Sequence, residues 1–183
     1  MRKLIYAINI TLDGCSDHTK GGGNVEILNY YTDLVGKSDL AVYGRKTYQL
    51  MVPYWPNAAK DKSSSKPEKA FAEAFNSMPK IVFSKKLKAS QVEKGVKIVR
   101  GNLKNEILKL KKQSGGNILT GGVSIPSQLI ALGLVDQLNV VVNPLLVGDG
   151  RRLLEGFSLD QELKLVEVKK FKSGSVLLRY LKK

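Results

Sequence analysis

Short apolar segments alternate with segments of helical spacing along most of this chain, and that order constrains its fold more than any single motif. Residues 4–10 form a nearly continuous apolar run, which is typical of a strand buried on both faces of a sheet. Residues 25–35 follow with apolar side chains at helical intervals, and Gly36 is placed to end that helix. The alternation predicts an α/β fold with a mostly parallel central sheet flanked by helices.

The same pattern predicts the remaining elements. Two apolar runs joined by Ser173-Gly174 predict a C-terminal antiparallel hairpin, and residues 52–67 predict an irregular surface stretch. Strands are expected at residues 39–43, 80–83, 96–99, 117–120, 135–142 (extended by 144–147), about 163–171 and 176–181. Helices are expected at residues 44–51, 68–76, 102–114 and 123–132.

The length of 183 residues predicts a single domain over residues 1–183. Apolar runs stay short of the roughly 18 residues that a membrane-spanning helix needs. The single cysteine, Cys15, has no partner for an internal disulfide, which favours a cytoplasmic location. The polar loop at residues 15–24, with glycines at 21–23, is expected to border a site at the end of the first strand.

The charge is strongly positive, with 30 Lys and Arg against 16 Asp and Glu, for a net charge of +14. Such an excess is compatible with nucleic acid, an anionic membrane or small phosphorylated ligands. The lysines are spread along the chain, without a dense basic arm and without interleaved aromatic residues. A solvated lysine-rich surface is the favoured interpretation, so neither a nucleic acid nor a membrane is the expected partner.

A candidate anion site lies at residues 39–50, where an apolar run ends at Gly44 and a short helical segment begins. Arg45, Lys46 and Thr47 fall in the first helical turn. Free N–H groups and the positive end of the helix dipole attract anions there, and arginine can bind a phosphate through two hydrogen bonds. The alternative is an ordinary turn with a solvated helix start.

A second strand-to-helix junction follows at Thr120-Gly121-Gly122-Val123-Ser124. Gly122 would let the backbone approach a pyrophosphate at the helix N-terminus, where a Cβ would obstruct it. Both junctions, Asp13-Gly14 and Ser84 follow predicted strands, and ligands of open α/β sheets bind at the carboxyl ends of the strands. This convergence suits a dinucleotide, although glycines that serve only as turns remain the alternative.

Several familiar signatures are absent from the sequence. No Gly-x-Gly-x-x-Gly follows the first strand, and position 31, where a P-loop ending at 36–38 would need glycine, holds Tyr31. The single histidine, His18, and the single cysteine make a zinc site improbable, so no metal is expected. Ser124 lacks the glycine context of a nucleophile elbow, which argues against a Ser-His-Asp hydrolase.

An ordered set of segments resembles the dihydrofolate reductase-like superfamily. The branch that it is most similar to is the C-terminal reductase domain of bifunctional riboflavin-biosynthesis proteins, and the resemblance covers nearly the whole chain. The segments are residues 10–14 (ITLDG), 43–48 (YGRKTY), 54–56 (YWP), 80–84 (KIVFS), 121–122 (GG), 133–136 (GLVD) and 144–148 (PLLVG). The zinc-binding deaminase half of the bifunctional proteins has no counterpart here.

The resemblance implies a dihydrofolate reductase-like fold, NADPH as hydride donor, and roles for particular residues. Asp13 would face the nicotinamide and substrate as the catalytic residue, and it would bind substrate together with Glu26 and Tyr30. Arg45 and Lys46 would favour the 2′-phosphate of NADPH. The implied cofactor-binding set is Ala7, Gly44, Arg45, Lys46, Thr47, Ser84, Gly121, Gly122, Val123 and Ser124.

The sequence departs from true dihydrofolate reductases where those carry a pterin-binding acid on the first long helix. Residues 26–30 read EILNY, so Glu26 is the only acid near that position, and this argues against folate as substrate. The leading hypothesis is an NADPH-dependent reductase of a small pyrimidine- or pterin-like substrate, most like 5-amino-6-(5-phosphoribosylamino)uracil reductase. The alternatives are a dihydrofolate reductase or other carbonyl or imine reductase, and a non-catalytic nucleotide- or nucleic-acid-binding module. The apolar terminal strands predict a homodimer.

Overall fold

The alternating pattern folds into one eight-stranded sheet in the computed structural model, which describes residues 1–20, 24–158 and 160–183. The predicted glycine run at 21–23 lies outside the described residues. The strands are β1 (Leu4–Thr11), β2 (Ser38–Gly44), β3 (Lys80–Phe83), β4 (Lys97–Val99), β5 (Asn117–Thr120), β6 (Gln137–Asn143), β7 (Leu163–Lys170) and β8 (Val176–Lys182). The helices are α1 (Val25–Gly36), α2 (Arg45–Lys60), α3 (Lys66–Ser77), α4 (Leu103–Lys112) and α5 (Ser124–Ala131), with a 3-10 turn at Ala89–Gln91.

The strand order is β4-β3-β2-β5-β1-β6-β8-β7. The first six strands pair in parallel, whereas β8 is antiparallel to both β6 and β7. The predicted α/β class, with a mostly parallel sheet and a C-terminal antiparallel hairpin, is therefore confirmed. The parallel strands direct their carboxyl ends to a common edge, where Thr11, Gly44, Phe83 and Thr120 lie.

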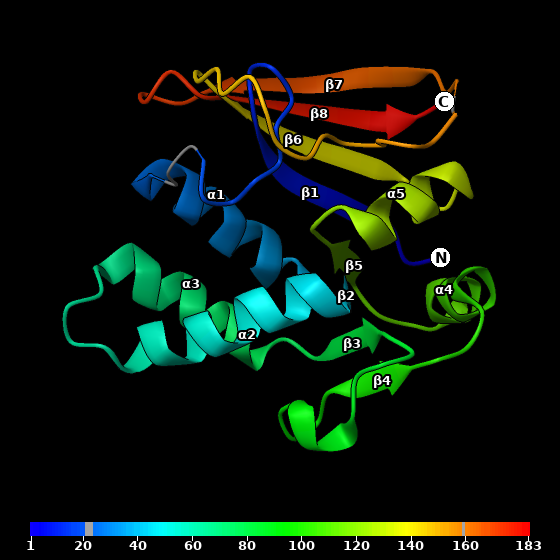
Figure 1. The fold of residues 1–183 in the computed structure, drawn as a ribbon. Helices are drawn as coiled ribbons and strands as arrows, with labels where there is room; N and C mark the ends of the chain where they lie inside the picture. The colour runs from blue at the N-terminus through cyan, green and yellow to red at the C-terminus, as the bar shows by residue number, and fades with distance from the viewer. Residues whose placement is uncertain (21–23, 159) are drawn as a thin grey trace.

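Helices cover both faces of the parallel sheet, and each layer has its own core (Figure 1). On one face, α1, α2 and α3 contribute Ile27, Tyr48 and Phe75 to a cluster that includes Ala41 and Val82 of the sheet. On the other, α4 and α5 pack Ile107 and Leu129 against Leu4, Val42 and Ile118. Burial on both faces explains the nearly continuous apolar run of β1.

Two predicted elements were wrong. The helix expected to end near residue 51 continues as α2 to Lys60, through Pro53 and Pro56, where an irregular stretch was expected. Packing outweighs the poor helix propensity of proline here: Val52 and Ala58 are buried, and the Trp55 ring lies 4.4 Å from that of Phe71 on α3. The predicted strand extension at 144–147 is not a strand. No described helix has the length and apolar character needed to cross a bilayer.

Candidate active site

The two predicted junctions are in direct contact. β2 delivers Gly44 to the start of α2, and β5 delivers Gly121-Gly122 to the start of α5. A Cβ built on Gly44 would lie 3.0 Å from Cγ1 of Ile125, and one built on Gly122 would collide with Oγ1 of Thr47. The close approach of the two helix starts therefore requires glycine at position 122, while a side chain at position 44 would need Ile125 to shift.

Gly122 also has a backbone conformation that favours glycine, with φ +79°. The Tyr6 hydroxyl, which projects from β1, donates a 2.9 Å hydrogen bond to the Gly122 carbonyl and so fixes the turn. Beside it, a Cβ on Gly121 would lie 3.6 Å from the carbonyl oxygen of Ala7. Three predicted cofactor-binding residues thus form one rigid backbone corner between β1 and β5.

A cavity of about 480 Å³ opens in front of this corner, and five residues of the predicted cofactor-binding set line it. These are Lys46, Thr47, Gly122, Val123 and Ser124. The remaining lining residues come from the loop after β1, from α2 and from the segment after β6: Ser16, Asp17, His18, Leu50 and Arg151. The residues come from four separate parts of the chain.

The cavity is suited to an anion. Lys46 and Arg151 bring two cations to it, against the single carboxylate of Asp17. His18 Nδ1 lies 3.6 Å from Oδ1 of Asp17, and its side chain is 61% exposed. Neither α2 nor α5 has a side-chain hydrogen bond at its N-cap, so their first N–H groups are left for a ligand. The sum of these charges and dipoles favours phosphate groups.

Asp13 does not line this cavity. Its carboxylate accepts a 2.5 Å hydrogen bond from the Thr11 hydroxyl and a 2.8 Å bond from the Gly148 N–H, with the Val147 N–H at 3.3 Å. The bond from Thr11, followed by that from Gly148, lowers the pKa of Asp13 below its ordinary value, which makes it a poor proton donor at neutral pH. The predicted catalytic role of Asp13 stays a prediction, while its contacts hold the segment after β6 in place.

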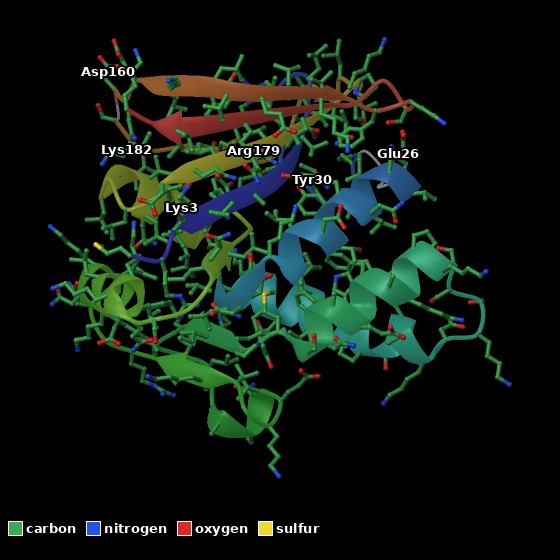
Figure 2. All side chains as sticks on the ribbon, turned by 180° about the vertical axis from the view of Figure 1, so that it is seen from behind. Lys3, Glu26, Tyr30, Asp160, Arg179 and Lys182 are labelled. Atoms are coloured by element: carbon green, nitrogen blue, oxygen red, sulfur yellow. The ribbon has the colours of Figure 1, made fainter. Side chains whose placement is uncertain are left out.

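Glu26 and Tyr30 do not line this cavity either, although both were predicted to bind substrate. The Glu26 carboxylate accepts a 2.6 Å hydrogen bond from the Lys172 N–H in the β7–β8 turn. Tyr30 is buried, which raises its pKa, and Figure 2 shows it extending from α1 toward the sheet, where Arg179 projects from β8. Arg179 in turn forms an ion pair of 2.5 Å with Glu167 of β7.

Arg45 and Ser84 lie outside the cavity lining as well. The Arg45 guanidinium donates a 2.7 Å hydrogen bond to Gln49 one turn along α2. The Ser84 hydroxyl accepts bonds of 3.2 and 3.0 Å from the N–H groups of Lys86 and Leu87, so it shapes the turn after β3. Both residues still follow the carboxyl ends of neighbouring strands, where the adenosine end of a dinucleotide is predicted to lie.

A second cavity, of about 540 Å³, runs between α2 and residues 91–93. Among the residues that the structure describes, Glu93 is the only charged one that lines this second cavity, and neither a glycine turn nor the start of an α-helix borders it. The second cavity is therefore unsuited to phosphates in spite of its larger volume.

Five of the ten residues that line the first cavity were not predicted to bind a ligand. Ser16, Asp17 and His18 belong to the loop at 15–24 that was expected to border a site, whereas no local pattern distinguished Arg151 from the other basic residues. Arg151 reaches the cavity only because the loop after β1 and the segment after β6 pair with each other, through backbone bonds such as Ser16 N–H to Arg151 carbonyl (2.8 Å). The parallel pairing of β1 with β6 brings these two segments together, and it was not specified by any short motif. Among the described residues, no group of His, Cys, Asp and Glu is arranged to hold a metal.

Comparison with known proteins places the chain in one family. The model of the RibD C-terminal domain matches residues 2–177. The uncharacterized protein YyaP of Bacillus subtilis (strain 168) is 30% identical over 183 residues, covering 98% of this chain and 94% of YyaP.

Solved structures share the fold at low sequence identity. A structure from Shewanella sp. PV-4 whose name refers to riboflavin biosynthesis has a TM-score of 0.75 at 18% identity, and covers 99% of each chain. The diaminohydroxyphosphoribosylaminopyrimidine deaminase/5-amino-6-(5-phosphoribosylamino)uracil reductase of Thermotoga maritima has a TM-score of 0.69 at 16% identity. That match covers all of this chain and 57% of the bifunctional protein.

Proposed function

The chain belongs to the RibD C-terminal domain family, and from this premise we propose that it is an NADPH-dependent reductase of a small, phosphorylated pyrimidine-like substrate. The observation that carries the proposal is the meeting of two uncapped helix starts at a cavity bordered by Lys46 and Arg151. Free N–H groups, dipoles and cations at one place fit the pyrophosphate of a dinucleotide.

The chain's own residues would do little chemistry beyond binding and orientation. When bound, NADPH supplies a hydride that can be transferred to a C=N or C=O bond. The glycine corner at Gly121-Gly122 and the first turn of α2 would hold the phosphates and so set the position of the reactive ring. The predicted role of Arg45 is to bind the 2′-phosphate that distinguishes NADPH from NADH.

A reaction like that of 5-amino-6-(5-phosphoribosylamino)uracil reductase is favoured over folate reduction. The acid nearest the pterin-binding position, Glu26, is engaged by the Lys172 N–H, and no residue of α1 lines the cavity among the described residues. The positive charge of the cavity suits a substrate that carries a phosphate.

The test is a titration of the purified protein with NADPH and with NADH, followed by the fluorescence of the reduced nicotinamide. Tight binding that prefers NADPH is the expected result, and failure to bind either would overturn the proposal. Lys46→Ala should lower the affinity for both cofactors. Lys60→Ala makes the same charge change at the other end of α2 and should leave both affinities unchanged. Riboflavin-pathway and pterin substrates can then be screened for oxidation of NADPH.

The proposed assembly is a homodimer formed through the edge of the sheet. β7 is the edge strand at the end of the sheet opposite β4, and its Leu165, Val166 and Val168 side chains are 47%, 44% and 57% exposed. Apolar side chains on an exposed edge are characteristic of interaction surfaces. Light scattering after size exclusion should give twice the chain mass, and Val168→Lys should shift it to the monomer.

A further inference from the structure

We propose that Arg151 binds a phosphate of the ligand at the N-terminus of α5, and that Asp13 positions Arg151 for this task. The inference rests on the proposed function, because the cavity it concerns is the one proposed for NADPH. It assigns Arg151 a contact with the pyrophosphate, which NADPH and NADH share, and leaves the 2′-phosphate to Arg45.

The Arg151 side chain points to the start of α5. Its Nη2 lies 3.1 Å from Oγ of Ser124, the first residue of that helix, and both side chains line the cavity. The positive charge of Arg151 also acts on the Tyr6 hydroxyl, which is hydrogen-bonded to the Gly122 carbonyl. Burial raises the pKa of Tyr6, and the guanidinium of Arg151 opposes that rise. Arg151 therefore lies over the glycine corner where a pyrophosphate would lie.

The guanidinium is available to a ligand. Of the described ion pairs, none includes Arg151, and its contact with Ser124 is with a neutral hydroxyl. An arginine carries five N–H donors in a planar fork, so one bond to Ser124 leaves the others for phosphate oxygens. By contrast, the buried cations Lys80 and Lys111 are held by carbonyl or carboxylate oxygens of the protein.

The backbone that carries Arg151 is fixed to the loop after β1. We call residues 147–152 the Arg151 strap. The Arg151 carbonyl of the strap accepts two hydrogen bonds from Ser16. One comes from the Ser16 N–H and the other from the Ser16 hydroxyl, each at 2.8 Å. A Cβ on Gly150 would lie 2.5 Å from Sγ of buried Cys15, so the two segments pack without room for a side chain.

Asp13 holds the other end of the strap. Its carboxylate accepts from the N–H groups of Val147 and Gly148, four and three residues before Arg151. A cation fixed in advance costs less ordering entropy on binding than a free surface arginine. Asp13 is therefore a positioning residue in this proposal, acting on the phosphate through Arg151.

The experiment compares Arg151→Ala and Arg151→Lys with Arg152→Ala, a matched control on the same strap with the same change in net charge and outside the cavity lining. Affinities for NADPH, NADH, inorganic pyrophosphate and ribose 5-phosphate are measured by calorimetry. Loss of a charge-assisted hydrogen bond predicts that Arg151→Ala weakens NADPH and NADH by the same factor, about tenfold or more. Arg151→Lys should recover part of this loss, and Arg152→Ala should bind like the wild type.

Other outcomes distinguish a phosphate of the cofactor from a phosphate of the substrate, and failure of the reductase proposal from failure of the Arg151 proposal. A loss confined to ribose 5-phosphate would place the substrate phosphate, rather than the cofactor's, at Arg151. If the wild type binds pyrophosphate through Arg151 but neither dinucleotide, the reductase proposal fails and the phosphate assignment stands. If NADPH binds and Arg151→Ala matches Arg152→Ala for every probe, or if no probe binds the wild type, the Arg151 assignment is overturned.

The positioning role of Asp13 has its own readout. Asp13→Asn should lower the affinities for NADPH and NADH by the same factor when Arg151 is present. In the Arg151→Ala background it should change these affinities little, because the effects of substituting residues that act as a unit are not additive. Additive losses would show that Asp13 acts independently of Arg151, as a catalytic or merely structural residue would.

Discussion

The two helices that begin at the cavity differ from the other three in how their first N–H groups are satisfied. The N-cap residues of α1, α3 and α4 are Asn24, Ser65 and Asn102, whose side chains each accept a hydrogen bond from the first turn. The N-cap residues of α2 and α5 are Gly44 and Val123, which provide no such side-chain bond. A capping side chain would compete with a ligand for the same N–H groups. We call a helix start closed where a side chain of the protein caps it and open where none does. The helix starts away from the cavity are closed, whereas the two that face the cavity are open, so their N–H groups stay available to a ligand.

Gly122→Ala is expected to break this contrast with the largest effect. A left-handed backbone costs a non-glycine residue about 1–2 kcal/mol, and the new Cβ would also collide with the Thr47 hydroxyl. The turn should therefore shift, with loss of dinucleotide binding and a fall in the free energy of unfolding. Urea unfolding and the NADPH titration measure the two effects.

Gly122→Val does not test binding alone, because its larger side chain would also collide with Thr47 and would occupy the same left-handed backbone conformation, so the fold itself should be disturbed. The double variant Gly122→Ala with Thr47→Ala separates the collision from the strain, since it removes the Thr47 hydroxyl. Its stability should be higher than the sum of the single losses implies. Wild-type NADPH affinity in Gly122→Ala would contradict the assignment of this corner to the pyrophosphate.

The fold was predictable because its signals are local. Alternating apolar runs and helical spacing suffice for the α/β class, and the predicted strand over residues 80–83 matches β3. α2 was mispredicted because Pro53 and Pro56 are strong local breakers, whereas the burial that overrides them depends on α3, which lies later in the chain. Local propensity cannot report such packing.

The candidate site was only half predictable, for a similar reason. Gly44, Lys46 and Gly122 carry short-range signals, because a glycine and a helix start are adjacent in the sequence. Arg151 lies 27 residues beyond Ser124 and reaches it only through the pairing of two loops. Glu26 and Tyr30 were assigned from resemblance, and their side chains are directed to the C-terminal hairpin instead.

Arg45→Ala tests whether the uncapped start of α2 recognises a particular phosphate of the cofactor. The Arg45 guanidinium is predicted to bind the 2′-phosphate, so the variant should lose about tenfold in NADPH affinity, the equivalent of one charge-assisted hydrogen bond. NADH affinity should be unchanged. Gln49→Ala, which releases Arg45 from its 2.7 Å bond, is the control and should retain NADPH preference. Equal losses for both cofactors would show that Arg45 does not recognise the 2′-phosphate.

Ser65→Ala tests the closed group of helix starts. Ser65 and Glu68 form a reciprocal capping box at the start of α3, remote from the cavity lining. Loss of the N-cap hydroxyl should lower the free energy of unfolding by about 1 kcal/mol. NADPH affinity should match the wild type, and Asn102→Ala at the start of α4 should behave in the same way. A fall in NADPH affinity in either variant would remove the distinction between closed and open helix starts.

The smallest effect is expected from the carboxylate of that same capping box. The hydroxyl of Ser65, followed by its N–H, lowers the pKa of Glu68 below its ordinary value of 4.5. Because the folded-state pKa is the lower one, the unfolded chain binds the proton first as the pH falls. The stabilisation from Glu68 is therefore complete above pH 4.5 and is lost as the pH falls through the folded-state pKa.

Denaturant unfolding of the wild type and of Glu68→Gln across this range measures the difference in stability between them. That difference should be largest near neutral pH and should shrink under acid conditions, where both side chains are neutral. A difference that is constant with pH would mean that the charge of Glu68 does not contribute to the cap. No carboxylate lies at N3 of α2 or α5, where the residues are Thr47 and Pro126, so an anion at those helix starts has to come from the ligand. The open starts should then gain stability from bound NADPH, while the closed start of α3 gains it from Glu68.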